Sequence, residues 1–400
     1  MTTVLISGAS IAGPSLALWL SRYGFNPTVV EIAPDLRVGG NAVDFRGDVH
    51  LPVLAQMGVL EDLRRLQTGG TAMRFIDRHG RVRLELPAEF AGGELEVLRG
   101  DLARVLYDHT RDTTEYIFGD SIISLTETPH GVDVGFASGA RRRFDLVIGA
   151  DGVHSAVRRL TFGPEERYVT HQGYYVAAWD VPNHLGLGRD SLQYNEPGRM
   201  VSICGDHRDP AKATAFAAFA SPARHYERRD RTAHEQLLGE VFAGMGWQAS
   251  QLLAALGSAP ELYVDAICRV DIEPWARGRI ALLGDAAWGA TIGGMGNGAA
   301  VVGAYVLAGE LAAAGGDHHL AFTSYQRLLR DFVRRCQDTG NGTGRFLVPR
   351  RAATIWLRDT WLNQRPVKNM MLKVAKDRTE AIDLPDYSRW LVQYRQRQGS

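Results

Sequence analysis

Cysteine is scarce in this chain: its 400 residues include three cysteines, Cys204, Cys268 and Cys336, which lie far apart. An odd number of widely spaced cysteines argues against a disulfide framework, and it does not match the short, regular spacings of cysteine metal sites. We therefore expect a reducing, cytoplasmic environment and no bound metal.

Long apolar runs and an excess of charge are also missing. No uncharged apolar stretch reaches the roughly 18 residues needed to cross a bilayer, and the first residues lack the basic start of a secretion signal. Lys plus Arg and Asp plus Glu both number 45, so the formal net charge is zero. Without a basic field to attract them, neither nucleic acid nor a membrane is an expected partner. The sequence gives no signal of oligomeric state.

What is present at the start of the chain is the pattern of a strand, a tight turn, a helix and a second strand. The apolar run 4–6 stops near Gly8, helical spacing follows at once, and a second apolar run ends at Glu31. This pattern predicts a dinucleotide-binding unit in which Gly8 makes the turn and Gly13 lets helix and strand pack closely. The free N–H groups near Ile11 would face a pyrophosphate, and Glu31 would accept hydrogen bonds from a ribose.

The fingerprint lacks its middle glycine, because Ser10 stands there. An ordinary crossover with small residues in its turn therefore stays open at this point. Two further turns follow predicted strands, at 149–152 and 284–287, and the last is followed by a small-residue helix from about Ala299 to Ala314. Turns at the carboxyl ends of parallel strands meet at one edge of a sheet, so these three turns are expected to converge on one elongated ligand.

Residues 171–274 have a different texture, with short β runs separated by Pro, Gly and Asn, which predicts a mostly antiparallel sheet. Its aromatic side chains are candidates for a flat apolar pocket, although such residues more often belong to a core; they are Tyr174, Tyr175, Trp179, Tyr194, Phe216 and Phe219. Region alone suggests His171, His207 and His225 as bases, and Arg199 and Tyr194 as substrate contacts. A catalytic base is therefore not assigned.

Together the motifs resemble those of the FAD-dependent class A monooxygenases, the family of para-hydroxybenzoate hydroxylase and the tetracycline-inactivating flavin hydroxylases. The resemblance covers most of residues 1–350. It rests on GASIAGPS with Glu31, the GG-x-AVDFRG loop, Arg99 before its helix, DLVIGADGVHSAVRR, and RIALLGDAA followed by GGMGNG.

The resemblance implies an α/β fold in which an FAD-binding Rossmann-type domain is interleaved with a mostly antiparallel β-sheet substrate domain, followed by C-terminal helices. The FAD-binding domain would comprise residues 1–71, 98–170 and 275–350. The substrate domain would comprise 72–97 and 171–274, and the C-terminal helical segment 351–400.

The resemblance also implies how FAD is held. The first turn would bind the pyrophosphate, Glu31 the adenosine ribose and Asp285 the ribityl chain, while Asp151 would serve both FAD and NAD(P)H. The backbone of 294–297 would lie against the isoalloxazine. The full expected set of cofactor-binding residues is Gly8, Ser10, Ile11, Ala12, Gly13, Glu31, Ile32, Asn41, Ala42, Arg46, Arg99, Asp151, Gly152, Gly284, Asp285, Gly294, Met295, Gly296 and Asn297.

The implied reaction is that of an NAD(P)H-using monooxygenase. Reduced FAD would react with O2 to a C4a-hydroperoxide, which would hydroxylate or epoxidise a bulky, largely apolar aromatic or polyketide-like molecule. The last motif departs from the family pattern, since Trp288 follows GDAA and no proline precedes the glycine loop. Three alternatives therefore stay open: an FAD protein catalysing a non-redox cyclisation, a nicotinamide-dependent dehydrogenase, and a binding protein without a chromophore.

Overall fold

A six-stranded sheet carries the first and last motifs of the chain. Its strand order is β17-β18-β11-β1-β2-β7, and all pairs except β17–β18 are parallel. The strands are β1 (Thr3–Ser7), β2 (Asn26–Glu31), β7 (Glu115–Phe118), β11 (Leu146–Gly149), β17 (Ala276–Arg277) and β18 (Ile280–Leu282). This computed structural model describes residues 1–36, 42–88, 93–206, 208–224, 230–290, 295–364, 366–367 and 382–391.

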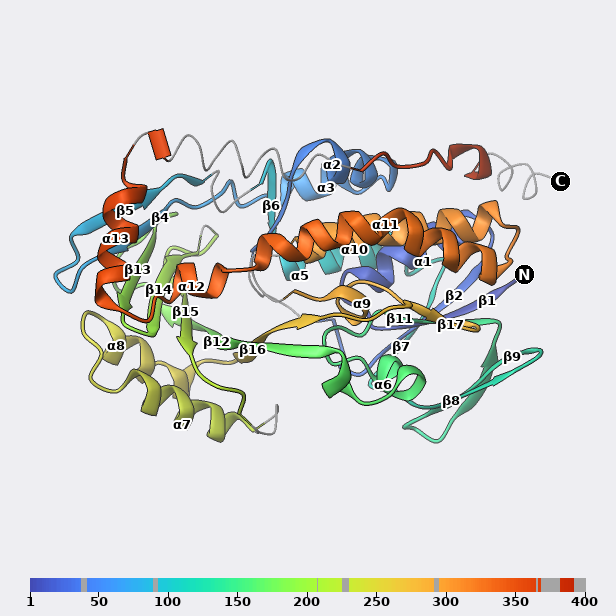
Figure 1. The fold of residues 1–400 in the computed structure, drawn as a ribbon, viewed down its shortest axis with the longest axis horizontal. Helices are drawn as coiled ribbons and strands as arrows, with labels where there is room; N and C mark the ends of the chain where they lie inside the picture. The colour runs from blue at the N-terminus through green and yellow to red at the C-terminus, as the bar shows by residue number, and fades with distance from the viewer. Residues whose placement is uncertain are drawn as a thin grey trace.

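Helices pack on both sides of this sheet (Figure 1). One side carries α1 (Ala12–Arg22), α2 (Gly47–Gln56), α3 (Leu60–Arg65), α5 (Arg99–Asp108), α10 (Gly296–Ala313) and α11 (His318–Gly340). The other carries α6 (Ala156–Phe162), η1 (Glu165–Arg167) and a small antiparallel sheet of β8 (Ile122–Thr128), β9 (Gly131–Phe136) and β10 (Arg141–Phe144). Because α10 consists largely of Ala, Gly and Val, it packs closely and is almost entirely buried.

A second, seven-stranded sheet has the order β16-β12-β15-β14-β13-β4-β5 and is antiparallel except where β13 pairs with β4. Its strands are β4 (Met73–Ile76), β5 (Val82–Leu86), β12 (Val169–Pro182), β13 (Ser191–Glu196), β14 (Arg199–Gly205), β15 (Lys212–Ala220) and β16 (Leu262–Val270). The remaining elements are β3 (Ala42–Phe45), β6 (Leu95–Leu98), α7 (Arg231–Phe242), α8 (Ala249–Ala254), η2 (Leu256–Ser258), α9 (Asp285–Trp288), α12 (Thr343–Leu347) and α13 (Ala352–Leu362).

The predicted α/β fold is thus confirmed, with a Rossmann-type parallel sheet, a mostly antiparallel second sheet and helices near the C-terminus. Two helix starts differ from the prediction. Arg99 lies in the first turn of α5 rather than before it, and α10 begins at Gly296 rather than near Ala299. Both helices begin earlier because the apolar pattern marks the first inward-facing residue, whereas the turn that starts a helix need not be apolar.

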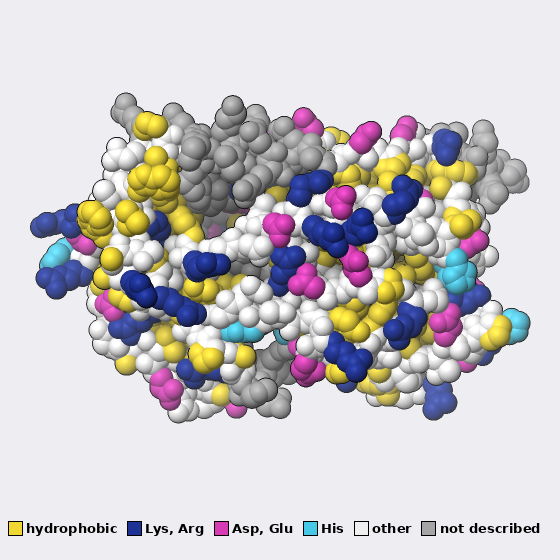
Figure 2. All heavy atoms as spheres, viewed as in Figure 1, with side chains coloured by type: hydrophobic (Ala, Val, Ile, Leu, Met, Phe, Trp, Pro, Cys, Tyr) yellow, Lys and Arg dark blue, Asp and Glu magenta, His cyan; other side chains and the backbone are white. Residues whose placement is uncertain are grey.

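Positive and negative side chains are interspersed over the face that α11 presents in Figure 2. Two ion pairs on this face are Arg269–Asp338 at 3.1 Å and Arg334–Glu273 at 2.9 Å. Such exposed pairs add little stability but leave no large field of one sign there. Within the described residues, no helix combines the length and apolarity needed to span a bilayer.

Candidate cofactor site

Three turns that are distant in the sequence lie together at one edge of the parallel sheet. They follow β1, β11 and β18, which are neighbours in the strand order. A Cβ placed on Gly8 would lie 2.5 Å from the Ala150 carbonyl oxygen, so the first two turns are in direct contact. The convergence expected from the sequence is therefore present.

The first turn needs glycine at two positions. Gly8 has φ +108°, a left-handed value that side chains disfavour, and a Cβ on Gly13 would lie 1.9 Å from the Gly8 carbonyl oxygen. Helix α1 starts after Ile11, and among the described residues no side chain caps its first turn. Within the part of the chain that the structure describes, helix N–H groups of this turn thus have no side-chain acceptor, which suits a phosphate.

Glu31 reaches back over this turn from the end of β2. Its Oε2 accepts a hydrogen bond from the Ala9 N–H at 2.8 Å, and its Oε1 accepts one from the Ala33 N–H at 3.0 Å. These bonds fix the carboxylate beside the first turn and leave further lone pairs for ligand hydroxyls. Ile32, which follows it, is exposed.

Asp151 orders the second turn. Its carboxylate accepts hydrogen bonds from the Ser155 hydroxyl, the Val157 N–H at 3.1 Å and the Ser7 hydroxyl at 3.3 Å. Burial raises the pKa of Asp151, while the bonds from Ser155 and Val157 lower it. The geometry gives Asp151 and the following Gly152 a part in holding the turn; a contact with NAD(P)H stays a prediction.

Arg158 of α6 ties the second turn to the third. It has no exposed surface, and its guanidinium donates to the Ala286 carbonyl oxygen at 2.8 Å and to the Val153 carbonyl oxygen at 2.5 Å. Burial lowers the pKa of Arg158, and the charge of nearby Glu165 raises it. One buried cation thus joins two turns that are expected to contact the same ligand.

The third turn places Asp285, which follows Gly284, against the start of α10. A Cβ on Gly296 would lie 3.2 Å from Asp285 Oδ1, and no side chain of the described residues caps the N-terminus of α10 at Met295. Burial raises the pKa of Asp285, the Arg99 charge lowers it and the Asp265 charge raises it. Within the described residues, its carboxylate accepts no hydrogen bond and is available to ligand hydroxyls.

Several other predicted residues lie near these turns. The exposed side chain of Arg99 donates from Nη2 to the Ser10 hydroxyl at 3.2 Å, and Arg46 pairs with Asp44 at 2.5 Å at the end of β3. The remaining predicted contacts in the described residues, Ala12, Ala42 and Asn297, lie at the starts of α1, β3 and α10. Asn41 and Gly294 lie outside the described residues, as do His207 and His225.

Sequence reasoning missed a group on β16 that faces the third turn. The Tyr263 hydroxyl donates to Asp265 at 3.3 Å, and Asp265 lies 3.7 Å from Nε2 of His154, whose Nδ1 is 2.8 Å from Glu165. The Asp265 charge acts on Asp285 as described above. A lone Tyr-x-Asp on a predicted strand carries no recognisable signal, so only the tertiary structure could have revealed this group.

The aromatic candidates divide between the two faces of the second sheet. Four of them, Tyr175, Trp179, Tyr194 and Phe219, belong to the core between the sheet and α7 and α8. Tyr174 and Phe216 lie in the cluster on the opposite face, where α12 packs.

The candidate base His171 and the candidate substrate contacts Arg199 and Tyr194 have structural partners. Arg199 donates to the carbonyl oxygens of Val241 and Ala243, and Tyr194 donates to Glu196. The His171 Nδ1 accepts from the Gly173 N–H, so the structure singles out neither His171 as a base nor Arg199 and Tyr194 as substrate contacts.

Trp288, the departure from the family pattern, is a core residue. It is 2 % exposed, and its ring lies 4.5 Å from that of Trp275 and 6.0 Å from that of Tyr325. The tryptophan therefore fills space beneath the third turn, and its side chain does not project from the sheet edge.

The donors and acceptors at this edge fit FAD. The start of α1 would suit a pyrophosphate, Glu31 and Asp285 would supply acceptors for the ribose and ribityl hydroxyls, and the start of α10 would suit a flavin carbonyl. FAD when bound supplies the redox chemistry, while the chain binds and orients it.

Substituting Asp285 tests its assignment to the cofactor. Asp285→Ala is expected to raise the FAD Kd about tenfold or more, because an acceptor for a hydroxyl is lost. The stability of the apoprotein, in contrast, should not fall in this variant. The raised pKa means that the folded state favours the protonated acid, so stability falls as pH rises from the unfolded to the folded pKa. At pH 7 the variant apoprotein should therefore be at least as stable as wild type.

Urea unfolding and fluorescence titration with FAD measure the two quantities. The exposed Asp112→Asn is a matched control, since it removes a carboxylate remote from the turns. An unchanged FAD Kd in Asp285→Ala would remove Asp285 from the site.

Comparison with known proteins agrees with this geometry. Residues 1–336 match the family model described as an FAD binding domain. A flavin-dependent monooxygenase of Legionella longbeachae is 35 % identical over 397 residues, covering 96 % of this chain and 98 % of the relative. An uncharacterized protein of Mycobacterium tuberculosis is 40 % identical over 344 residues, covering 84 % and 92 %. The crystal structure of tetracycline destructase Tet(55) superimposes with a TM-score of 0.83 at 35 % identity, covering 96 % and 98 %. The chain therefore belongs to the FAD-binding-domain family and is a flavin-dependent monooxygenase.

Proposed function

We propose that the enzyme uses NAD(P)H and O2 to hydroxylate or epoxidise a bulky, flat and mostly apolar aromatic or polyketide-like molecule. Family membership sets aside the dehydrogenase and the binding protein without a chromophore. In this proposal, the strands and helices around the parallel sheet bind FAD. The second sheet, built from segments within 72–97 and 171–274, binds the substrate.

The observation that carries the proposal is a direct link between the second sheet and the last cofactor motif. Val270, at the end of β16, donates its N–H to the Gly289 carbonyl oxygen at 2.8 Å. The backbones of Arg269 and Ala290 form an isolated antiparallel β-bridge. Ala290 follows the third turn and precedes the start of α10 by a few residues. A substrate held by the second sheet would thus lie beside the segment expected to contact the flavin, which is the proximity that oxygen transfer requires.

The composition of one face of the second sheet supports an apolar substrate. The face turned away from α7 and α8 carries the apolar Val176, Met200, Phe216, Ala218 and Ile267, which cluster with Leu347 of α12, while Asp265 lies beside Val176 on the same face. On the same face of β13, Gln193 is 3 % exposed, and its Oε1 has no hydrogen-bond partner among the described residues. An apolar surface with a few polar groups is typical of a small-molecule site. Since one relative is named a tetracycline destructase, tetracycline is the first molecule to test.

The experiment follows oxidation of NADH and of NADPH by the FAD-loaded enzyme, with and without tetracycline and a panel of aromatic polyketides. Support would be substrate-stimulated oxidation together with a product heavier by one oxygen atom that carries label from 18O2. A product formed equally well without reductant and oxygen would instead establish the non-redox cyclisation. No product with any panel member despite rapid flavin reduction would refute the substrate class and leave the reductant assignment standing.

A further inference from the structure

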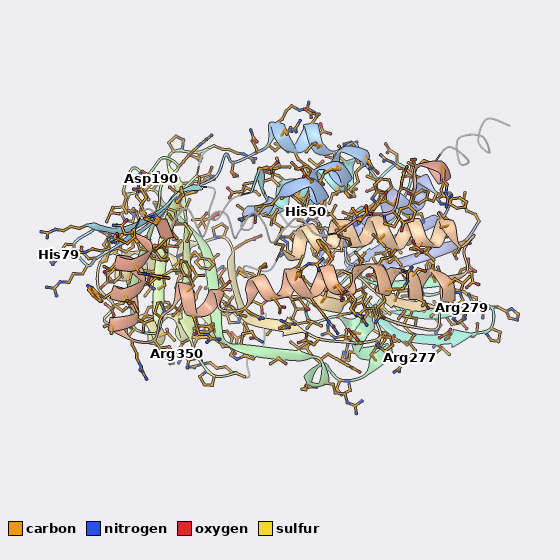
Figure 3. The ribbon with its side chains drawn as sticks, turned by 45° about the horizontal axis from the view of Figure 1, so that its top comes forward. His50, His79, Asp190, Arg277, Arg279 and Arg350 are labelled. Atoms are coloured by element: carbon orange, nitrogen blue, oxygen red, sulfur yellow. The ribbon has the colours of Figure 1, made fainter. Side chains whose placement is uncertain are left out.

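The side chain of His50, which no sequence motif singled out, is enclosed beside the cofactor site. It has no exposed surface, and its ring centroid lies 6.1 Å from that of Phe45 and 6.4 Å from that of Phe332. Figure 3 shows His50 between α2 and the end of α10 at which that helix begins. A polar ring therefore occupies a position that packing alone would fill with an apolar residue.

One ring nitrogen of His50 is used and the other is not. Nδ1 accepts a hydrogen bond from the Arg46 N–H at 3.2 Å, at the start of α2. Burial lowers the pKa of His50 to about 4, so the ring is neutral at pH 7 and its proton is on Nε2. Among the described residues, Nε2 has no partner. Enclosing an unpaired donor destabilises a folded protein and calls for an explanation.

The unpaired edge of the ring abuts the first turn of α10. A Cβ on Gly298 would lie 2.5 Å from Nε2, so only glycine permits the ring to sit there. The same first turn contains Gly296, which packs against Asp285. His50 thus contacts two backbone segments: Arg46, which follows β3, and the first turn of α10.

We propose that His50 is a positioning residue for FAD, holding the start of α10 and the Arg46 backbone in fixed relation so that both segments fit the flavin end of the cofactor. Because Nε2 is enclosed, His50 acts through these two segments and not by touching FAD. Leucine, of similar volume, would remove the unpaired donor but also the acceptor for the Arg46 N–H. The histidine therefore lowers the stability of the apoprotein and at the same time fixes the geometry of the site.

The test compares His50→Leu with His50→Gln, which keeps an acceptor for the Arg46 N–H. Three readouts are used: urea unfolding of the apoprotein, the FAD Kd from fluorescence titration, and the visible circular dichroism of bound FAD. His50→Leu should leave the apoprotein as stable as wild type or more so, raise the Kd about tenfold, equivalent to 1.4 kcal/mol, and change the dichroism. His50→Gln should recover most of the affinity and the wild-type spectrum.

A second pair of variants tests the contact with α10. Gly298→Ala should weaken FAD binding because the new Cβ overlaps the ring, and His50→Ala in the same chain should restore part of the affinity by making room. The exposed His130→Leu is the matched control.

Three results would overturn the proposal: an unchanged Kd and dichroism in His50→Leu, no recovery in His50→Gln, or strictly additive losses in the double variant. Since no reductant or substrate is added, failure here is distinct from failure of the proposed reaction.

Discussion

Replacing Arg158 by methionine is expected to lower the free energy of unfolding by roughly 3 kcal/mol and to weaken FAD binding at the same time. The guanidinium is fully buried and is the hydrogen-bond donor to the Val153 and Ala286 carbonyl oxygens. Methionine fills much of the same volume but leaves both oxygens buried without that donor. The second and third turns would then lose the residue that joins them, so the groups expected to face FAD would no longer be held in place.

Arg158→Lys should be intermediate, since an ammonium cannot reproduce the two-pronged geometry of a guanidinium. The neighbouring Arg159 is exposed, so Arg159→Met removes the same charge without touching either turn and should change both quantities little. Urea unfolding and FAD titration of the three variants give the comparison. If Arg158→Met lost stability while its FAD Kd stayed at the wild-type value, Arg158 would be a core residue with no bearing on the cofactor.

Gly13→Ala, which adds one methyl group to the first turn, is expected to lower both the free energy of unfolding and the FAD content strongly. The new Cβ would lie 1.9 Å from the Gly8 carbonyl oxygen, a backbone atom that cannot turn aside. Helix α1 would have to move away from β1, at a cost of roughly 3 kcal/mol. That movement would also open the turn whose N–H groups are expected to bind the pyrophosphate, so the purified variant should contain little FAD.

Gly239→Ala provides the matched control, because Gly239 lies inside α7 and no described residue comes within 4 Å of its added Cβ. Alanine is the better helix former, so this variant should gain stability by up to about 1 kcal/mol. The opposite signs expected for two helical Gly→Ala changes separate steric contact from helix propensity. Equal stability and FAD content in Gly13→Ala and wild type would show that α1 does not pack as described.

Asp285 and His50 illustrate a shared property of this site. Each is a polar group held by the apoprotein without a full set of partners: a carboxylate that accepts no hydrogen bond from the described residues, and an enclosed ring nitrogen. Such groups reduce stability and are retained where a ligand or a geometry requires them. Asp285→Ala and His50→Leu are therefore expected to bind FAD more weakly, while their apoproteins should be as stable as wild type or more stable.

The sequence by itself determined the features that depend on local backbone geometry. A glycine needed for a left-handed turn, as at Gly8, or for close helix packing, as at Gly13, must be written into the chain at that position. An acidic residue at the end of the second strand is recognisable because it stands at a regular distance after the glycine turn, and Glu31 does reach the first turn. Periodicity likewise predicted both sheets, because alternating and continuous apolar runs reflect which faces of a strand are buried.

The tertiary structure alone decided which distant groups meet. Arg158 contacts a carbonyl oxygen 128 residues away, and His50 lies against Gly298. It also decided that Tyr175 and Trp179 face α7 and α8, while Phe216 faces the opposite side of the sheet. These outcomes depend on how sheets and helices pack across long sequence separations. A single sequence records each residue's own preference but not its neighbours in space, so the motifs of the site were predictable and the residues that hold them together were not.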